Sequence, residues 1–198
     1  MISGNYTRLP LPDLAVSALI IVDMQDFFFR KSERRSGLDG VLANINLLID
    51  YFDKKGMPVV HVRSAYRSDG SNWDLKMRAA GLSELIDGTP EAALLPQIAA
   101  RAQHLQIVKT RYSAFFKTGL AEMLGRLGVS RVMVAGAYTH YCVNATVFDA
   151  YAHDFVPGLI SDAVISHLVE ESALMVERMR RNGYHVMTTA EFLAGAEG

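Results

Sequence analysis

The sequence has very little cysteine: one residue, Cys142, in a chain of 198. A single cysteine can form neither an internal disulfide nor a cysteine-rich zinc site, so it is either a buried apolar side chain or a reactive thiol. An excess of charge of one sign is also missing, because 20 Lys and Arg residues balance 21 Asp and Glu residues. Nucleic acid is therefore not an expected partner, since phosphate binding requires a basic face.

Long hydrophobic runs are absent as well. The longest apolar stretch, residues 16–22, is interrupted by Ser17 and is too short to cross a bilayer. Residues 1–14 lack the basic start and long apolar segment of a secretory signal. We therefore expect a cytoplasmic protein without a membrane partner, in a compartment where a lone thiol stays reduced.

Short apolar runs alternate with segments of helical periodicity along the whole chain. The runs cover residues 18–22, 57–62, 105–108, 131–135, 155–160 and 184–187, and the expected helices cover 41–55, 91–102, 120–127, 143–152 and 168–181. This alternation predicts βαβ units and a mostly parallel sheet in a single α/β domain spanning residues 1–198. The polar stretch at 64–101 interrupts the alternation and is a candidate lid or specificity loop.

Three chemically reactive residues lie just after three of the apolar runs. Asp23 follows the first run, Lys109 follows the third, and Cys142 lies a few residues after the fourth, at the start of an expected helix. Ligands of open α/β sheets bind beyond the carboxyl ends of the strands, so these residues are expected at one rim. A lysine and a helix N-terminus lower a thiol pKa, and a carboxylate can take the thiol proton. The alternatives for single residues are an inert core cysteine, a capping aspartate and a solvated lysine.

At these residues the chain resembles the isochorismatase-like cysteine hydrolase superfamily. Three blocks carry the resemblance, in order: ALIIVDMQDFF at 18–28, IVKTRYSAF at 107–115 and VAGAYTHYCVNAT at 134–146. The resemblance implies a three-layer α/β/α fold with a six-stranded parallel sheet. It also implies a catalytic triad in which Asp23 is the general base, Lys109 polarises the site and lowers the thiol pKa, and Cys142 is the nucleophile.

The resemblance further implies a cis peptide bond between Ala137 and Tyr138, and an oxyanion hole formed by the backbone N–H groups of Tyr138 and Cys142. Nicotinamidases of the family carry a metal cluster after the second strand, but residues 61–69 of this chain hold one histidine without that spacing. We therefore expect no metal and no other cofactor. A homodimer or homotetramer is the assembly that the resemblance suggests.

The expected substrate is a small molecule. Candidate substrate-binding residues are Gln25, Phe28, Arg63, Trp73, Arg111 and Tyr112. The arginines can hold a carboxylate through bidentate hydrogen bonds, and the aromatic residues can form walls of a pocket. For Gln25, a polar cap at the strand end is an equally good interpretation. For each arginine taken singly, a solvated position or a structural salt bridge is the commoner role, and for each aromatic residue a core position is.

Three functions remain open on the sequence. The first is a metal-independent cysteine hydrolase that cleaves a C–N bond of a small amide, carbamoyl or ureido substrate through a thioester. The second is an isochorismatase-type vinyl-ether hydrolase that releases pyruvate, because the MQDF and RYSAF segments resemble that branch, although Cys142 stands where it usually has glycine. The third is a non-catalytic binding or scaffold protein that retains the fold.

Overall fold

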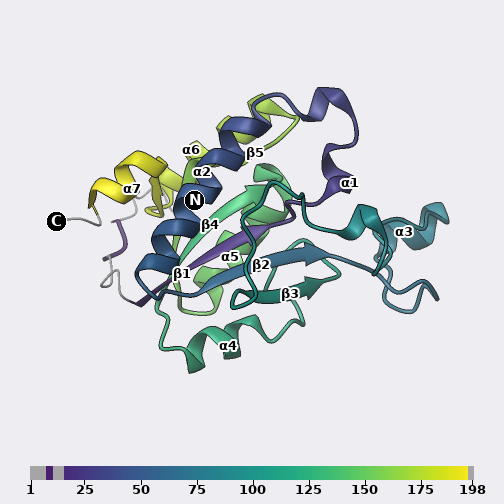
Figure 1. The fold of residues 1–198 in the computed structure, drawn as a ribbon, viewed down its shortest axis with the longest axis horizontal. Coiled ribbons are helices and arrows are strands. Elements are labelled where there is room, and N and C mark those ends of the chain that lie inside the picture. The colour runs from purple at the N-terminus through teal and green to yellow at the C-terminus, as the bar shows by residue number, and fades with distance from the viewer. Residues whose placement is uncertain (1–7, 11–15, 196–198) are drawn as a thin grey trace, which may run out of the picture.

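The computed structural model describes residues 8–10 and 16–195. At its centre lies a six-stranded sheet: β1 (Ser17–Val22), β2 (Val59–Ser64), β3 (Leu105–Lys109), β4 (Arg131–Ala137), β5 (Val156–Ile165) and β6 (His185–Met187). The strands run in the order β3-β2-β1-β4-β5-β6, and every neighbouring pair is parallel. The expectation of a parallel six-stranded sheet in an α/β fold is confirmed (Figure 1).

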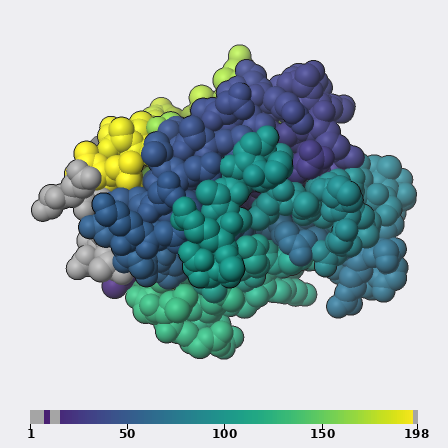
Figure 2. Space-filling model, viewed as in Figure 1, coloured from purple at the N-terminus to yellow at the C-terminus, as the bar shows by residue number. Residues whose placement is uncertain are grey.

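Helices cover both faces of the sheet. Side chains of α2 (Leu38–Lys54) and α7 (Thr189–Gly195) contribute to the apolar core on one face, and those of α4 (Leu120–Arg126), α5 (Asn144–Ala152) and α6 (Val169–Arg181) to the core on the other. Two short helices, α1 (Asp26–Phe29) and α3 (Leu75–Ala80), and the 3-10 turns at Ser32–Arg34 and Pro90–Ala92 lie in the connections. Figure 2 shows the segment that contains α3 projecting at the right of the molecule.

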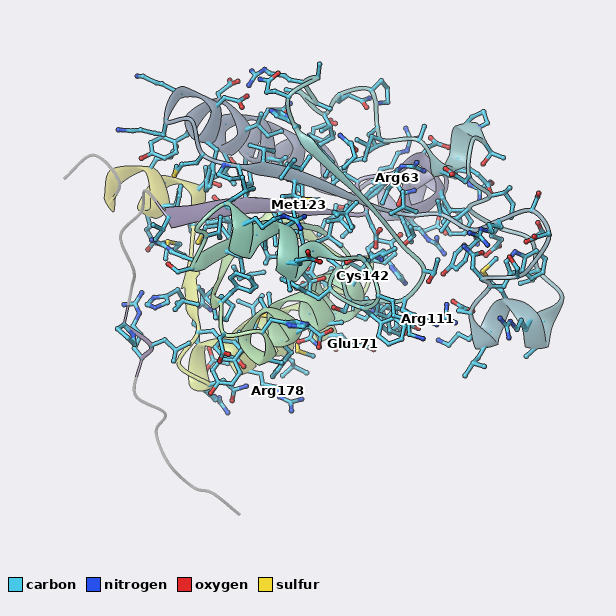
Figure 3. The ribbon with its side chains drawn as sticks, turned by 90° about the horizontal axis from the view of Figure 1, so that it is seen from below. Arg63, Arg111, Met123, Cys142, Glu171 and Arg178 are labelled. Carbon is cyan, nitrogen blue, oxygen red and sulfur yellow. The ribbon has the colours of Figure 1, made fainter. Side chains whose placement is uncertain are left out.

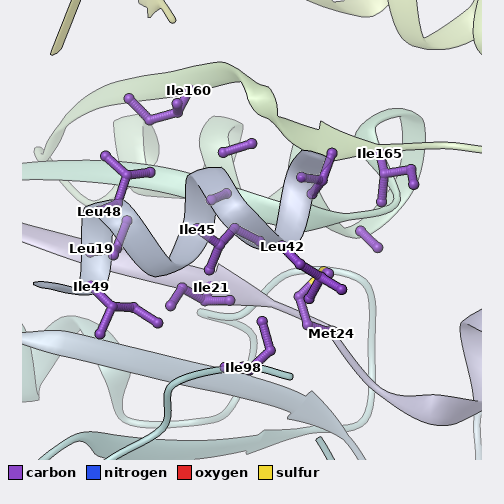
Figure 4. Close-up of a cluster of buried hydrophobic side chains, with 14 of the residues drawn as sticks. Leu19, Ile21, Met24, Leu42, Ile45, Leu48, Ile49, Ile98, Ile160 and Ile165 are labelled. Carbon is purple, nitrogen blue, oxygen red and sulfur yellow. The ribbon is translucent and has the colours of Figure 1, made fainter. Parts of the chain in front are cut away.

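The alternation of side chains along β1 supplies both cores. Leu19 and Ile21 pack under α2, whereas Ala18, Ile20 and Val22 pack on the opposite face, and all five are fully buried. Residues buried on both faces explain why the strand reads as an unbroken apolar run. Figure 4 shows the α2 side of this core, where each fully buried leucine or isoleucine stabilises the fold by about 1.5–3 kcal/mol.

The expected helix over residues 91–102 was wrong. The structure has only the turn at Pro90–Ala92 there, followed by irregular chain. Pro96 cannot donate the backbone hydrogen bond that a helix interior requires, and its ring clashes with the preceding turn. The segment instead bonds to the chain after β1, where Leu95 N donates to Met24 O at 2.8 Å.

The strand order creates a crevice at one edge of the sheet. From β1 the chain passes to β2 and β3 on one side, and then to β4, β5 and β6 on the other. Connections that leave in opposite directions open a gap beyond the carboxyl ends of β1 and β4, where α/β proteins bind ligands. None of the helices among the described residues combines the length and apolar character needed to cross a bilayer.

Candidate active site

The three reactive residues meet beyond the carboxyl ends of β1, β3 and β4. Asp23 directly follows β1, Lys109 ends β3, and Cys142 lies in the π-helical turn Thr139–Val143 that follows β4. Lys109 Nζ lies 2.7 Å from Asp23 Oδ2 and donates to Cys142 Sγ at 3.3 Å. The charge of Asp23 also acts on the thiol and raises its pKa. The structure therefore brings together the acid, the cation and the thiol.

A fourth residue, Ser64, joins the two charged groups. Its hydroxyl donates to Asp23 Oδ1 at 3.0 Å and accepts from Lys109 Nζ at 2.7 Å. Ser64 is the last residue of β2, which lies between β1 and β3, and it pairs in register with Lys109. Sequence analysis missed it: its position just after an apolar run resembles that of Asp23 and Lys109, but a serine hydroxyl does not stand out as a reactive group.

The site is buried and locally strained. Asp23 and Lys109 are at most 1% exposed, and Cys142 is 7% exposed. Asp23 has a backbone φ of 51°, in the left-handed region that non-glycine residues seldom occupy. A buried ion pair is weak evidence for stability because desolvation offsets its Coulombic attraction. Function is the usual explanation for a strained residue in a buried charged group.

Burial dominates the protonation of the thiol. Burial and the Asp23 charge raise the pKa of Cys142 well above its usual range, and the opposing effect of Lys109 is smaller. Lys109 lowers the thiol pKa, as expected, but burial and Asp23 outweigh this effect, so the pKa is raised overall. Burial also disfavours the charged form of Lys109, but Asp23 and Cys142 outweigh it and raise the pKa of this lysine. The raised pKa values favour the neutral form of the thiol and the ammonium form of the lysine.

The turn that carries Cys142 begins at a glycine and a cis peptide bond. Gly136 has a φ of 113°, and a Cβ atom there would lie 2.1 Å from the backbone oxygen of Val22, so only glycine fits. The peptide bond between Ala137 and Tyr138 is cis. Tyr138 and Cys142 are the residues expected to form the oxyanion hole, and both line a cavity beside this turn.

This cavity has a volume of about 930 Å³, near the upper end of the usual range for small-molecule sites. Of the candidate substrate-binding residues, Phe28, Arg111 and Tyr112 line it, as do Ser64, Lys109 and Cys142. Residues of the 64–101 segment also contribute, among them Tyr66, Lys76 and Leu85. The segment thus reaches the site, while its role as a lid or specificity loop stays a prediction.

Gln25, Arg63 and Trp73 are not among the lining residues. Side chains alternate along a strand, so Arg63 points to the opposite face of β2 from Ser64 and pairs with Asp87 at 2.7 Å. Figure 3 shows Arg63 on the other side of the sheet from Cys142 and Arg111. The Trp73 indole donates to the backbone oxygen of Arg67 at 2.8 Å.

Gln25 is fully buried and contacts the backbone of Ser64 rather than the cavity. Its Nε2 donates to the backbone oxygens of Ser64 and Ala92, each at 2.8 Å, and its Oε1 accepts from Ser64 N at 2.7 Å. These bonds fix the end of β2 and hence the Ser64 hydroxyl. Gln25 is therefore placed to orient Ser64 rather than to touch a ligand.

Sequence analysis also missed several residues at the cavity wall. Tyr141, Lys76 and Tyr66 line it, and none of them lies in a pattern that distinguishes it from a surface residue. Among residues 8–10 and 16–195, no three His, Cys, Asp or Glu side chains gather as a metal-ligand set.

Comparisons with known proteins identify the family of this chain. Residues 17–191 match the isochorismatase domain family. The chain is 30% identical over 185 residues to a probable inactive nicotinamidase of Arabidopsis thaliana, covering 89% of this chain and 94% of that protein. It is 28% identical over 190 residues to an isochorismatase of Bacillus subtilis, covering 95% of this chain but only 60% of the relative.

A solved structure is also similar. The pyrazinamidase of Pyrococcus horikoshii, described in complex with zinc, superposes with a TM-score of 0.77 at 30% identity, over 87% of this chain and 99% of that one. The relatives' names thus cover both amidases and an isochorismatase. On the family match and this likeness together, the chain belongs to the isochorismatase family of hydrolases.

Proposed function

We propose that this protein hydrolyses a C–N bond of an amide, carbamoyl or ureido substrate through a thioester on Cys142. The observation that carries the proposal is the contact of 3.3 Å between Lys109 Nζ and Cys142 Sγ, in a buried group that Asp23 completes. A cysteine held between a base and a cation, facing a cavity, is the arrangement that nucleophilic catalysis requires.

The first step is a proton transfer within the buried group. Because the pKa of the thiol is raised, Cys142 is protonated in the free protein and needs a base at the moment of attack. Asp23 takes the proton as Sγ attacks the substrate carbonyl carbon, and the Lys109 ammonium stabilises the negative charge that develops on sulfur. The net charge of the three side chains is unchanged by this transfer, so little additional desolvation is required.

Attack by sulfur gives a tetrahedral intermediate whose oxygen carries a negative charge. The backbone N–H groups of Tyr138 and Cys142 are proposed to stabilise this oxyanion. The C–N bond then breaks as protonated Asp23 gives its proton to the departing nitrogen, which leaves as ammonia or an amine. Asp23 is again a carboxylate, and the acyl group is held on Cys142 as a thioester.

Water completes the cycle. Asp23 takes a proton from the water molecule, the resulting hydroxide adds to the thioester carbonyl, and the C–S bond breaks. The acid product leaves, and Asp23 returns the proton to the thiolate. These steps use only the side chains and backbone of this chain, so activity is expected to survive treatment with a metal chelator.

The test is ammonia release from a panel of small amides, carbamoyl and ureido compounds, with the wild-type protein and Cys142→Ala. We expect release by the wild type and a loss of about 10⁴-fold or more in the variant, since the nucleophile is removed. Retained release by Cys142→Ala would contradict the mechanism.

The vinyl-ether alternative is tested with the same two proteins, the wild type and Cys142→Ala, by measuring pyruvate release from isochorismate. Pyruvate release from isochorismate that persists in Cys142→Ala would favour it, because that reaction does not use the thiol. Its motivation is the RYSAF segment at residues 111–115 together with the similarity to the Bacillus subtilis isochorismatase.

A further inference from the structure

Basic residues are concentrated around the cavity although the whole chain is nearly neutral. Six of the 20 Lys and Arg residues line it, compared with two of the 21 Asp and Glu residues. The six are Arg30, Lys31, Arg34, Lys76, Lys109 and Arg111. Composition alone does not produce such a bias, and a cavity lined by one sign of charge attracts ligands of the other.

Two of these cations already have carboxylate partners. Lys109 pairs with Asp23, and Arg30 pairs with Glu91 at 2.9 Å. The two acidic lining residues are Asp74 and Glu84. Asp74 is occupied at both oxygens, since Oδ1 accepts from Met77 N at 2.8 Å and Oδ2 accepts from the Tyr66 hydroxyl at 3.3 Å. Positive charge therefore remains in excess at the wall.

Arg111 is a cation of the cavity wall whose hydrogen bonds within the described part of the chain all go to backbone carbonyl groups. Its Nη1 donates to the backbone oxygens of Thr110 at 2.6 Å and Asn72 at 3.3 Å, and its Nη2 donates to Trp73 O at 3.4 Å. It makes no ion pair with a carboxylate of the described residues. Neutral carbonyls thus fix the guanidinium without neutralising it, and a guanidinium retains further donors for a bidentate anion.

Lys76 supplies a second cation from α3. Its Nζ donates to the Tyr112 hydroxyl at 2.9 Å and lies 5.7 and 5.8 Å from the ring centroids of Tyr112 and Tyr141. These two rings stack with centroids 5.4 Å apart. Tyr141 is adjacent to Cys142 in the chain, so the pair connects the nucleophile to the loop that carries Arg111.

The distance from the reacting atoms is suitable for a small molecule. Arg111 is two residues from Lys109, so their backbones lie within about 7 Å of each other. Figure 3 draws Arg111 and Cys142 on the same side of the sheet. The cavity of about 930 Å³ has room for a substrate with one end at each residue.

We propose that the substrate carries a carboxylate that binds Arg111, assisted by Lys76, while its C–N bond lies at Cys142. This inference rests on the proposed function and specifies its substrate class as the half-amides of dicarboxylic acids and related anionic amides. Arg111 and Lys76 are specificity-determining residues in this account and take no part in bond cleavage.

The test measures binding by calorimetry to Cys142→Ala, which cannot turn its ligand over. The probes are matched pairs: the half-amide of glutaric acid with pentanamide, and 4-carbamoylbenzoate with 4-methylbenzamide. The carboxylate of each pair is expected to bind about tenfold tighter or more, because a charge-assisted bidentate contact contributes 1.5–3 kcal/mol. Adding Arg111→Met should remove this preference, and adding Lys76→Met should reduce it without disturbing the loop at Arg111.

Arg63→Met is the matched control, because Arg63 lies on the opposite face of β2 and should leave the preference unchanged. Equal affinities within both pairs, no measurable binding of either carboxylate, or a preference that survives both Arg111→Met and Lys76→Met would overturn the proposal. Ammonia release by the protein with intact Cys142 separates the two claims. Turnover of neutral amides alone leaves the proposed function standing and removes this inference. Tight binding of the half-amides without turnover would overturn the proposed function and with it their assignment as substrates, and would leave only a carboxylate-binding site at Arg111.

Discussion

Ser64 connects the two charged side chains of the site through one hydroxyl group. It donates to Asp23 and accepts from Lys109, and Gln25 holds its backbone from behind. A carboxylate and an ammonium that share a fixed hydroxyl lose little orientational freedom, so the acid stays aimed at the thiol. This is the preorganisation that proton transfer in a buried site requires.

Replacing Ser64 by alanine should therefore lower kcat by roughly 10- to 100-fold, since losing hydrogen bonds to charged groups costs about 1.5–3 kcal/mol. The measurement is ammonia release at saturating substrate. Ser17→Ala is the matched control: Ser17 is a fully buried serine of β1 whose hydroxyl has no hydrogen-bond partner among the described residues. Equal kcat values for the two variants would show that Ser64 does not support catalysis.

The sequence could identify Asp23, Lys109 and Cys142 because each carries a reactive group directly after an apolar run or, for Cys142, a few residues beyond one. It could not identify Ser64 in the same way, since serine is common at strand ends and has no chemistry that singles it out. The sign of the thiol pKa shift depends on burial, which spacing along the chain does not reveal.

At the scale of elements, the side-chain alternation of β2 decides which polar residues reach the site. Val60, Val62 and Ser64 point to one face, and Arg63 points to the other. Sequence analysis placed Arg63 with the substrate. The run expected from the sequence, 57–62, ended before Arg63, whereas β2 continues to Ser64. Neighbouring residues of a strand point to opposite faces of the sheet, so only one of Arg63 and Ser64 can face the site. Likewise, Pro96 was overlooked within an otherwise helical pattern.

Gly136 fixes the approach of β4 to β1 just before the nucleophile turn. The added methyl group of Gly136→Ala would meet the Val22 backbone at 2.1 Å, and the φ of 113° disfavours any side chain. We expect the free energy of unfolding to fall by at least about 3 kcal/mol, as for severe overpacking. Urea denaturation measures this loss.

Gly125→Ala provides the comparison for this glycine. Gly125 lies in α4, and a Cβ atom there meets nothing within 4 Å, so the substitution should be neutral or slightly stabilising. A Gly136→Ala protein as stable as Gly125→Ala would refute the close backbone contact.

For the whole molecule, the strand order explains why residues far apart in sequence share one site. The carboxyl ends of β1 and β4 are neighbours, and β2 and β3 extend the same edge, so Asp23, Ser64, Lys109 and Cys142 converge. Alternating helices and strands predicted the parallel sheet and its class. The order of the strands was not predicted, because periodicity does not specify which strands are neighbours, and it comes from the structure.

Global stability should depend on pH through His61. This residue is fully buried in β2, its Nε2 lies 2.9 Å from Nδ1 of His104, and His104 bonds to Asp53 of α2 at 3.1 Å. Burial, followed by the charge of His104, lowers the pKa of His61 from 6.5 to about 4. Burial also lowers the pKa of His104.

A lowered histidine pKa means that the unfolded chain binds the proton first. Stability is therefore complete above pH 6.5 and falls as the pH decreases toward 4, by up to about 3 kcal/mol from His61. Urea denaturation at pH 7.5 and pH 4.5 measures the change, and His61→Gln should show a smaller one. An identical loss in both proteins would exclude His61 as the source.

The central claim is that Cys142 carries the acyl group of an amide substrate as a thioester. Partitioning with hydroxylamine tests it most directly, because hydroxylamine competes with water for an acyl-enzyme and yields a hydroxamate. With any amide that the protein hydrolyses, the wild type is predicted to form the hydroxamate of the acyl group, and Cys142→Ala neither hydroxamate nor ammonia. Ammonia release without hydroxamate in the wild type, or undiminished hydroxamate in Cys142→Ala, would contradict the account.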